Sequence, residues 1–145
     1  DSAVQVGEAR FGFSKKLSPL FEIRDKDAQV LGAYASNGAA ALAKKKLAQH
    51  TSVYSAVGNL PAAVYREIAR AAGVHIYYEG RDPVYINSRL FGIHMQTDAT
   101  PTITFPLSKA ARLEELFDGG DVRVENGICR LPYKPGETKL YLVHL

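Results

Sequence analysis

The sequence has no tryptophan, one cysteine and one methionine among its 145 residues. Because Cys129 has no partner, an internal disulfide and a zinc site built from several cysteines are both excluded. Without tryptophan, a sugar-stacking surface would have to be built from other aromatic rings. No apolar run approaches the roughly 18 to 20 residues that cross a bilayer. We therefore expect no membrane partner.

The charge is nearly balanced, with 18 basic and 15 acidic residues and a formal net charge of +3. Basic and acidic residues alternate over residues 24–27 and 112–115, and the one dense basic cluster is Lys44, Lys45 and Lys46. A surface that follows nucleic-acid phosphates needs several separated cations and stacking groups. We interpret the lysine triplet as a solvated face and expect no nucleic-acid partner.

Residues 1–80 predict an α/β arrangement. Strands are expected over residues 29–35, 39–47 and 51–57, although the alanines and lysines of 39–47 also suit a helix. A helix is expected after Asn59 as cap and Pro61 in the first turn, ending at Gly73. A strand over residues 74–78 would complete a strand-helix-strand unit with parallel strands. In that unit, Val64, Ile68 and Ala72 would face a sheet containing Val53 and Ile76.

The first 19 residues predict a loop or an edge strand. Phe11 and Phe13 alternate around Gly12 and would serve as apolar anchors over a sheet edge. The chain begins at Asp1 rather than at a methionine, so we expect a processed product, a fragment or the end of a longer protein.

Residues 81–145 predict an antiparallel β domain, because short strands alternate with turn clusters. Turns are expected at residues 125–127 and 134–137, which carry Asn, Gly and Pro. Residues 113–117 suit either a helix or a strand. Strands are expected over residues 84–86, 90–96, 102–105, 122–124, 128–131 and 140–143. The predicted fold is therefore α/β followed by all-β, with a domain boundary after residue 80.

The residues that could carry chemistry are scattered. Cys129 lies inside an expected strand, away from the strained turn or helix start that a nucleophilic thiol needs. The four histidines occupy different segments, and no two carboxylates are singled out as a glycosidase pair. We expect no catalytic group, metal site or cofactor. Tyr77, Tyr78 and Tyr85 are candidates for carbohydrate contact, and packing in the core or at its rim is the alternative for the same rings.

Two parts of the sequence resemble known domains. Residues 30–34, 51–57, 59–61 and 68–77 resemble the trimerisation domain of β-galactosidase-type glycoside hydrolases, which has a glutamine-amidotransferase-like fold. Residues 84–87, 93–94, 102–106, 116–119 and 135–141 resemble the small antiparallel β domain that closes many such hydrolases. The resemblance covers roughly residues 21–145 and implies the second half of an amidotransferase-like layer followed by a β-sandwich.

The resemblance also bears on function. No segment matches the amidotransferase nucleophile elbow, and the catalytic carboxylates of the hydrolases belong to a barrel domain that the chain does not contain. The implied function is a non-catalytic accessory or assembly module from the C-terminal part of a glycoside-hydrolase-like protein. Its implied partners are a second copy or an N-terminal catalytic domain, with carbohydrate as a further candidate. A stand-alone carbohydrate-binding module and a divergent hydrolase are the alternatives.

Overall fold

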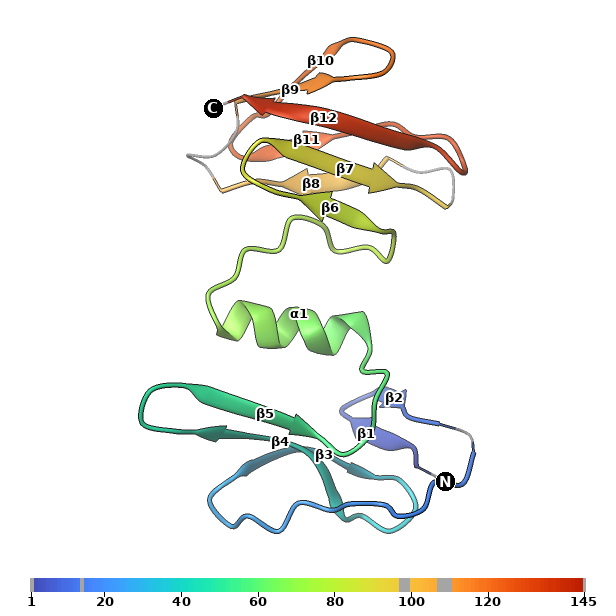
Figure 1. Ribbon diagram of the computed structural model, residues 1–145, viewed down its shortest axis with the longest axis vertical. Coiled ribbons are helices and arrows are strands. Elements are labelled where there is room, and N and C mark those ends of the chain that lie inside the picture. Colours follow the sequence, from blue (N-terminus) through green and yellow to red (C-terminus); the bar gives the residue numbers. More distant parts are fainter. Residues whose placement is uncertain (1, 14, 97–99, 107–110, 145) are drawn as a thin grey trace. The chain divides into compact units, whose positions relative to one another are not determined.

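The computed structural model describes residues 2–13, 15–96, 100–106 and 111–144, and it is mostly β with one short helix (Figure 1). The chain divides into two compact units, Asp1–Tyr65 (unit 1) and Arg66–Leu145 (unit 2). The division falls inside the helix, whereas the sequence placed a boundary after residue 80. Each unit has its own cluster of buried apolar side chains.

Unit 1 is built on one antiparallel sheet with the strand order β2-β1-β3-β4-β5. The expected strands over residues 29–35, 39–47 and 51–57 are confirmed, and the helical alternative for 39–47 is excluded. The strands are β1 (Val4–Val6), β2 (Ala9–Phe11), β3 (Gln29–Tyr34), β4 (Ala40–Lys46) and β5 (Thr51–Ser55).

The choice of a strand for residues 40–46 has a packing reason. Ala41, Leu42 and Ala43 are all buried, so β4 is covered on both of its faces. Small alanine side chains allow close cover on one face, while Leu42 packs into the unit 1 core with Val4, Phe11 and Val57. Tertiary packing therefore overrides the helical propensity of alanine and lysine at this position.

The N-terminal residues form part of this sheet. β1 and β2 make a hairpin in which Val4 lies opposite Phe11, and both side chains are buried. The Ser2 hydroxyl donates to the Phe13 carbonyl (2.9 Å) and accepts from the Phe13 N–H (3.0 Å). The predicted edge strand is confirmed as β2. Of the two expected anchors only Phe11 is buried, because the Phe13 ring is exposed.

The helix α1 (Ala62–Ala71) matches its prediction in extent. It ends as expected at Gly73, whose φ is +76°, with the Val74 N–H bonded to the Ala69 carbonyl and the Gly73 N–H to the Arg70 carbonyl. Asn59 does not act as the expected cap, because it adopts a left-handed conformation and its side-chain amide donates to the Gly12 carbonyl (3.0 Å).

The apolar face predicted for the helix is confirmed in part. Val64 and Val53 both pack against the unit 1 core, whereas Ala72 is exposed and the apolar face ends before it. No helix in the described part of the chain is long and apolar enough to cross a membrane.

The strand expected over residues 74–78 is not formed, and this prediction was wrong. The segment runs beside β8 (Thr102–Thr104) and shares with it one backbone bond, from the Thr104 N–H to the Tyr77 carbonyl (2.9 Å). The Thr104 hydroxyl adds a bond to the Ile76 carbonyl (2.7 Å). Every strand pair among the described residues is antiparallel, so the structure does not contain the parallel unit that the sequence predicted.

Unit 2 contains a five-stranded antiparallel sheet with the order β10-β9-β12-β7-β6 and a two-stranded sheet, β11-β8. The six expected strands of this region are confirmed, and of residues 113–117, for which a helix or a strand was expected, 113–115 form a strand while 116 and 117 belong to the turn after it. The remaining strands are β6 (Val84–Ile86), β7 (Leu90–His94), β9 (Arg112–Glu115), β10 (Asp121–Arg123), β11 (Ile128–Arg130) and β12 (Thr138–His144).

The two sheets of unit 2 contribute side chains to one core, as in a β-sandwich. Phe91 from β7 packs against Phe105 just after β8, with ring centroids 5.7 Å apart. Tyr141 of β12 and Cys129 of β11 join the same cluster. The predicted reversal at residues 125–127 is also present, because Asn126 and Gly127 both have positive φ and Glu125 bonds to Ile128 in both directions.

A pair of matched substitutions tests this core. Ile103 on β8 is fully buried, whereas Ile128 on the paired strand β11 is 47% exposed. We expect Ile103→Ala to lower the free energy of unfolding by about 2–5 kcal/mol and Ile128→Ala by less than about 1 kcal/mol. Chemical denaturation followed by circular dichroism measures both, and equal losses would contradict the assigned core.

Candidate functional site

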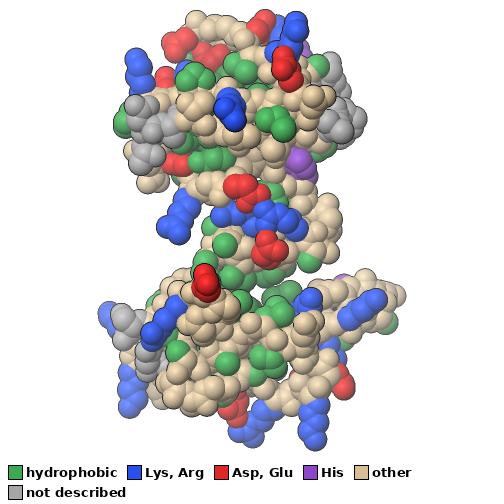
Figure 2. All heavy atoms as spheres, turned by 180° about the vertical axis from the view of Figure 1, so that it is seen from behind, with side chains coloured by type: hydrophobic (Ala, Val, Ile, Leu, Met, Phe, Trp, Pro, Cys, Tyr) green, Lys and Arg blue, Asp and Glu red, His purple; other side chains and the backbone are tan. Residues whose placement is uncertain are grey.

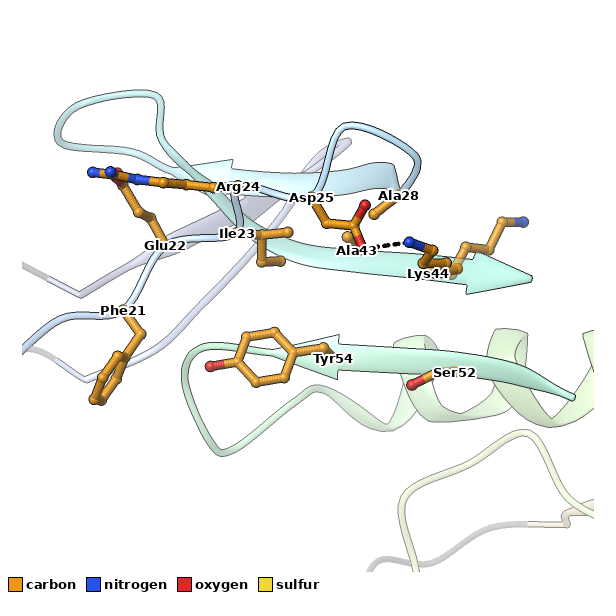
Figure 3. Close-up of a pocket in the computed structure, with 11 residues that line it drawn as sticks. Phe21, Glu22, Ile23, Arg24, Asp25, Ala28, Ala43, Lys44, Ser52 and Tyr54 are labelled. Carbon is orange, nitrogen blue, oxygen red and sulfur yellow. Dashed lines mark hydrogen bonds and ion pairs between the residues drawn. The ribbon is translucent and has the colours of Figure 1, made fainter. Parts of the chain in front are cut away.

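The described residues of unit 1 line an open pocket of about 320 Å³ on the sheet (Figure 3). One wall is the segment before β3, residues 21–28, which we call the wall segment. The other wall is formed by the strands β4 and β5. The lining residues are Phe21, Glu22, Ile23, Arg24, Asp25, Ala28, Ala43, Lys44, Lys45, Ser52 and Tyr54. The pocket thus combines two aromatic rings, small apolar side chains and charged groups.

The two aromatic rings are exposed at the pocket. Phe21 is 61% exposed and Tyr54 50% exposed. Figure 3 shows the Tyr54 ring extending from β5 toward the end of the pocket at which Phe21 lies. Tyr54 pairs in register with Ala43, which pairs with Val30, so Tyr54 shares its sheet face with small or aliphatic side chains. This face is opposite to the one on which Leu42 enters the core.

Most charged groups of the pocket are paired with acidic or basic neighbours, and Lys44 is the lining cation for which the described residues provide no ion pair. Lys45 Nζ lies 2.7 Å from Asp25 Oδ2 and 3.6 Å from Asp27 Oδ2, while Arg24 pairs with Glu22. The Lys45 hydrogen bond lowers the pKa of Asp25, helped by the Asp27 N–H, and the same bond to Asp25 raises the pKa of Lys45. Both groups therefore remain charged over a wide pH range.

Three bonds hold the wall segment in place. The Ile23 N–H donates to the Ala40 carbonyl (2.9 Å), which ties the segment to the start of β4. The Tyr34 hydroxyl donates to the Phe21 carbonyl (2.8 Å), and burial raises the pKa of Tyr34. The Asp27 N–H donates to Asp25 Oδ1 (3.0 Å), which fixes the turn that presents the carboxylate.

Sequence reasoning did not single out these residues. Lys45 belongs to the triplet interpreted as a solvated face, and Tyr54 lies in the strand expected over residues 51–57. The available signal was the acidic turn at residues 25–27, twenty positions before the lysines. The pairing of that turn with β4 depends on the tertiary fold.

The three tyrosines expected as carbohydrate contacts do not form one exposed platform. Tyr77 is half-buried and its ring meets Phe105 edge-on, with centroids 5.5 Å apart. Tyr78 is also half-buried and its hydroxyl donates to Asp82 Oδ2 (2.7 Å). Only Tyr85, 72% exposed on β6, presents a free ring face to solvent. The packing alternative thus describes Tyr77 and Tyr78 better.

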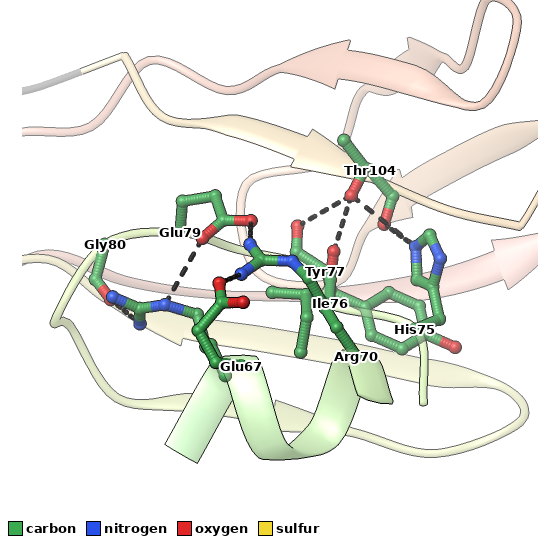
Figure 4. A network of polar contacts seen from close by, with 9 residues as sticks. Glu67, Arg70, His75, Ile76, Tyr77, Glu79, Gly80 and Thr104 are labelled. Atoms are coloured by element: carbon green, nitrogen blue, oxygen red, sulfur yellow. Dashed lines mark hydrogen bonds and ion pairs between the residues drawn. The ribbon is translucent and has the colours of Figure 1, made fainter. Parts of the chain in front are cut away.

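A polar network in unit 2 holds the segment that carries these tyrosines (Figure 4). Arg70 on α1 pairs with both Glu67 and Glu79, and Arg66 pairs with Glu79 (3.2 Å) and donates to the Gly80 carbonyl (3.0 Å). The Arg70 pairs lie on exposed side chains and contribute little to stability, whereas Arg66 is half-buried. The role of these pairs is to fix the loop after the helix.

Three of the four histidines have separate structural partners. His75 Nε2 lies 2.8 Å from the Thr104 carbonyl, which can only accept, so this nitrogen is the donor. His94 bonds to the Thr138 hydroxyl (2.7 Å), and His144 pairs with Glu114 (2.8 Å). Each interaction orients one side chain in a different place, as expected from the sequence spacing.

Cys129 is buried in β11, as the sequence predicted. Burial raises its pKa to about 11. A thiol with this pKa is almost entirely protonated at neutral pH and is a poor nucleophile.

The adjacent carboxylates Glu114 and Glu115 point to opposite faces of β9. Glu114 faces outward to His144, whereas Glu115 is buried and its Oε2 accepts from the Phe117 N–H (3.2 Å). Glu115 thus orders the turn after its strand. Within the described residues, no three His, Cys, Asp or Glu side chains are grouped so that they could hold a metal ion.

Charge is mixed over the surface. On the face drawn in Figure 2, acidic side chains lie among the basic ones in both units. A phosphate-tracking surface would instead gather unpaired cations in one stripe.

Comparisons of this chain with protein-family models, with curated proteins and with solved structures return no match. The geometry of the two units is therefore the basis for a functional proposal, together with the sequence resemblance.

The Cys129 thiol gives the first test of this part of the structure. A pKa about two units above the ordinary value implies a roughly 100-fold smaller thiolate fraction at neutral pH. We expect alkylation of the folded protein by iodoacetamide to be at least about 100-fold slower than alkylation of the unfolded protein at the same pH. Comparable rates, measured by mass spectrometry, would contradict the buried placement.

High pH gives the second test. The folded protein retains protons on Cys129 and Tyr78, whose pKa values are raised by burial to about 11 and about 12, while the unfolded chain releases them near pH 9 and 10. Stability should therefore fall as pH rises from about 9 to 12. We expect calorimetry to show a falling melting temperature over this range, with a shallower fall in Cys129→Ala. A flat profile would show that these groups titrate normally.

Proposed function

We propose that this chain is a non-catalytic accessory or assembly module from the C-terminal part of a glycoside-hydrolase-like protein. The sequence resemblance supports the family context, although the antiparallel sheet of unit 1 does not contain the parallel strand-helix-strand unit of an amidotransferase-like layer. The protonated Cys129 and the separately engaged histidines support a non-catalytic role. The observation that carries the assembly role is the open edge of β5.

β5 forms the edge of the unit 1 sheet. The Ala56 N–H donates to the Ala41 carbonyl, and the Leu47 N–H donates to the His50 carbonyl. With the register of β4 and β5, these bonds show which residues of β5 direct their backbone groups toward β4 and which direct them outward. In an antiparallel pair the residues between such bonded positions direct their N–H and C=O groups outward. Thr51, Val53 and Ser55 therefore present unpaired backbone groups along the free edge.

This edge lacks the usual protection against pairing. Residues 51–55 contain no proline and no charged side chain, and the register to β4 is regular over all five positions. The other sheet edges among the described residues are shorter, since β2, β6, β8, β10 and β11 have three residues each. Of these strands, β2, β10 and β11 also carry charged residues. An uncharged, regular edge strand is a template for another strand.

A second copy of the same strand fits this edge. In an antiparallel pair centred on Val53, the two Val53 residues would exchange two backbone bonds, and Ser52 would lie opposite Tyr54 of the partner. Such an isologous contact closes a two-fold dimer and leaves no charged group unpaired. A strand supplied by an N-terminal catalytic domain would use the same outward groups, and it is the other partner that the proposal allows.

We expect the chain to form a dimer at micromolar concentrations and Val53→Pro to be monomeric, because proline removes the outward N–H donor at the centre of the pair. Val53→Ala is the matched control, since it loses the same core contact but keeps the donor. Analytical ultracentrifugation compares the three proteins, and circular dichroism confirms that each is folded. Thr51→Pro, at an exposed position, provides a second variant if Val53→Pro unfolds.

A monomeric parent at concentrations of about 100 μM would remove self-association, and dimers of all variants would show that another surface pairs. The family context has a separate test. The intact mass and coding sequence of the native polypeptide reveal whether a catalytic barrel accompanies this chain.

A further inference from the structure

We infer that the pocket between the wall segment and the β4–β5 face binds a neutral saccharide, either a mono- or disaccharide or the end of a longer chain. The pocket lies on the sheet face opposite the Leu42 core and is independent of the three tyrosines expected from the sequence. The inference adds a ligand to the proposed accessory role. It rests on that role only for the choice of sugars to be tested.

The aromatic rings provide the stacking surface. Phe21 is 61% exposed and Tyr54 is 50% exposed, although both line the same pocket as the buried Ala43. Exposed aromatic faces that border a concave site offer apolar area to a ligand at little conformational cost. A pyranose ring has an apolar C–H face that matches such a surface, and hydroxyl groups that project around its rim.

The polar groups suit hydroxyls better than ions. Asp25 supplies carboxylate acceptors, Lys45 supplies ammonium donors, and Ser52 lines the same pocket with a hydroxyl. Asp25 and Lys45 neutralise each other, as do Arg24 and Glu22, so an anionic ligand would have to compete with these ion pairs and would find only Lys44 unpaired among the described lining cations. A neutral polyol can bond to both members of a pair without separating their charges.

The size and openness of the pocket limit the ligand. A volume of about 320 Å³ lies at the lower end of the roughly 300–1,000 Å³ found for small-molecule sites. The pocket is open on one side, so part of a bound sugar would remain in solvent. This arrangement suits weak recognition of a chain end and does not suit enclosure of a cofactor.

The experiment uses the whole chain with methyl β-galactoside, lactose and cellobiose as neutral probes and galacturonate as a charged comparison. Saturation-transfer NMR detects binding, and titration calorimetry measures the dissociation constants. We expect neutral sugars to bind in the millimolar range. Phe21→Ala and Tyr54→Ala should each weaken binding by roughly three- to tenfold.

Two exposed tyrosines outside the pocket serve as matched controls. Tyr65→Ala on α1 and Tyr85→Ala on β6 remove rings that are at least as exposed as Tyr54, and both variants should bind like the parent. Phe21 lies outside β5, so Phe21→Ala should bind sugar more weakly by the stated factor while its sedimentation stays that of the parent. Its behaviour therefore separates failure of this inference from failure of the assembly proposal.

Three results would overturn the inference. No detectable binding of any neutral probe would remove the saccharide site. Loss of binding in Tyr85→Ala, with Tyr54→Ala unchanged, would move the site to β6. Stronger binding of galacturonate than of the neutral sugars would show that the pocket recognises an anion.

Discussion

The arrangement of both units depends on how the faces and edges of their β-sheets are covered. In unit 2 a two-stranded sheet covers one face of a five-stranded sheet, so that Phe91, Ile103 and Tyr141 lie in a common core, and the edge strands have only three residues each. The sheet of unit 1 is covered only in part. The Leu42 face packs into a core, whereas the part of the other face around Tyr54 and the β5 edge are left accessible. Both functional proposals concern surfaces that this incomplete cover leaves open.

The two open features of unit 1 are linked through β5. Its backbone supplies the free edge at Thr51, Val53 and Ser55, and its side chains Ser52 and Tyr54 line the pocket. The alternation of a strand separates these roles, because side chains project above and below the sheet while backbone groups project within it. One five-residue strand can therefore serve a protein contact and a ligand contact without conflict between them.

The charged groups near the pocket show how a solvated cluster acquires a specific arrangement. Three consecutive lysines in a strand alternate between faces, so only Lys45 shares its face with Ser52 and meets the acidic turn. Exposed ion pairs contribute little to folding stability. Their effect here is to place a donor and an acceptor at fixed positions beside two aromatic rings.

Local patterns in the sequence determined most of the secondary structure. Alternation and turn residues located the strands of unit 2, and proline and glycine bounded the helix, because these signals depend on neighbouring residues only. Cys129 was assigned to a strand for the same reason. Tertiary structure decided the rest. Residues 74–78 have strand-like composition, yet Thr104 holds them beside β8 through few bonds. The pocket arises because residues 21–28 fold onto β4 and β5, and no local pattern encodes a pairing between segments that are separated by a turn and a whole strand.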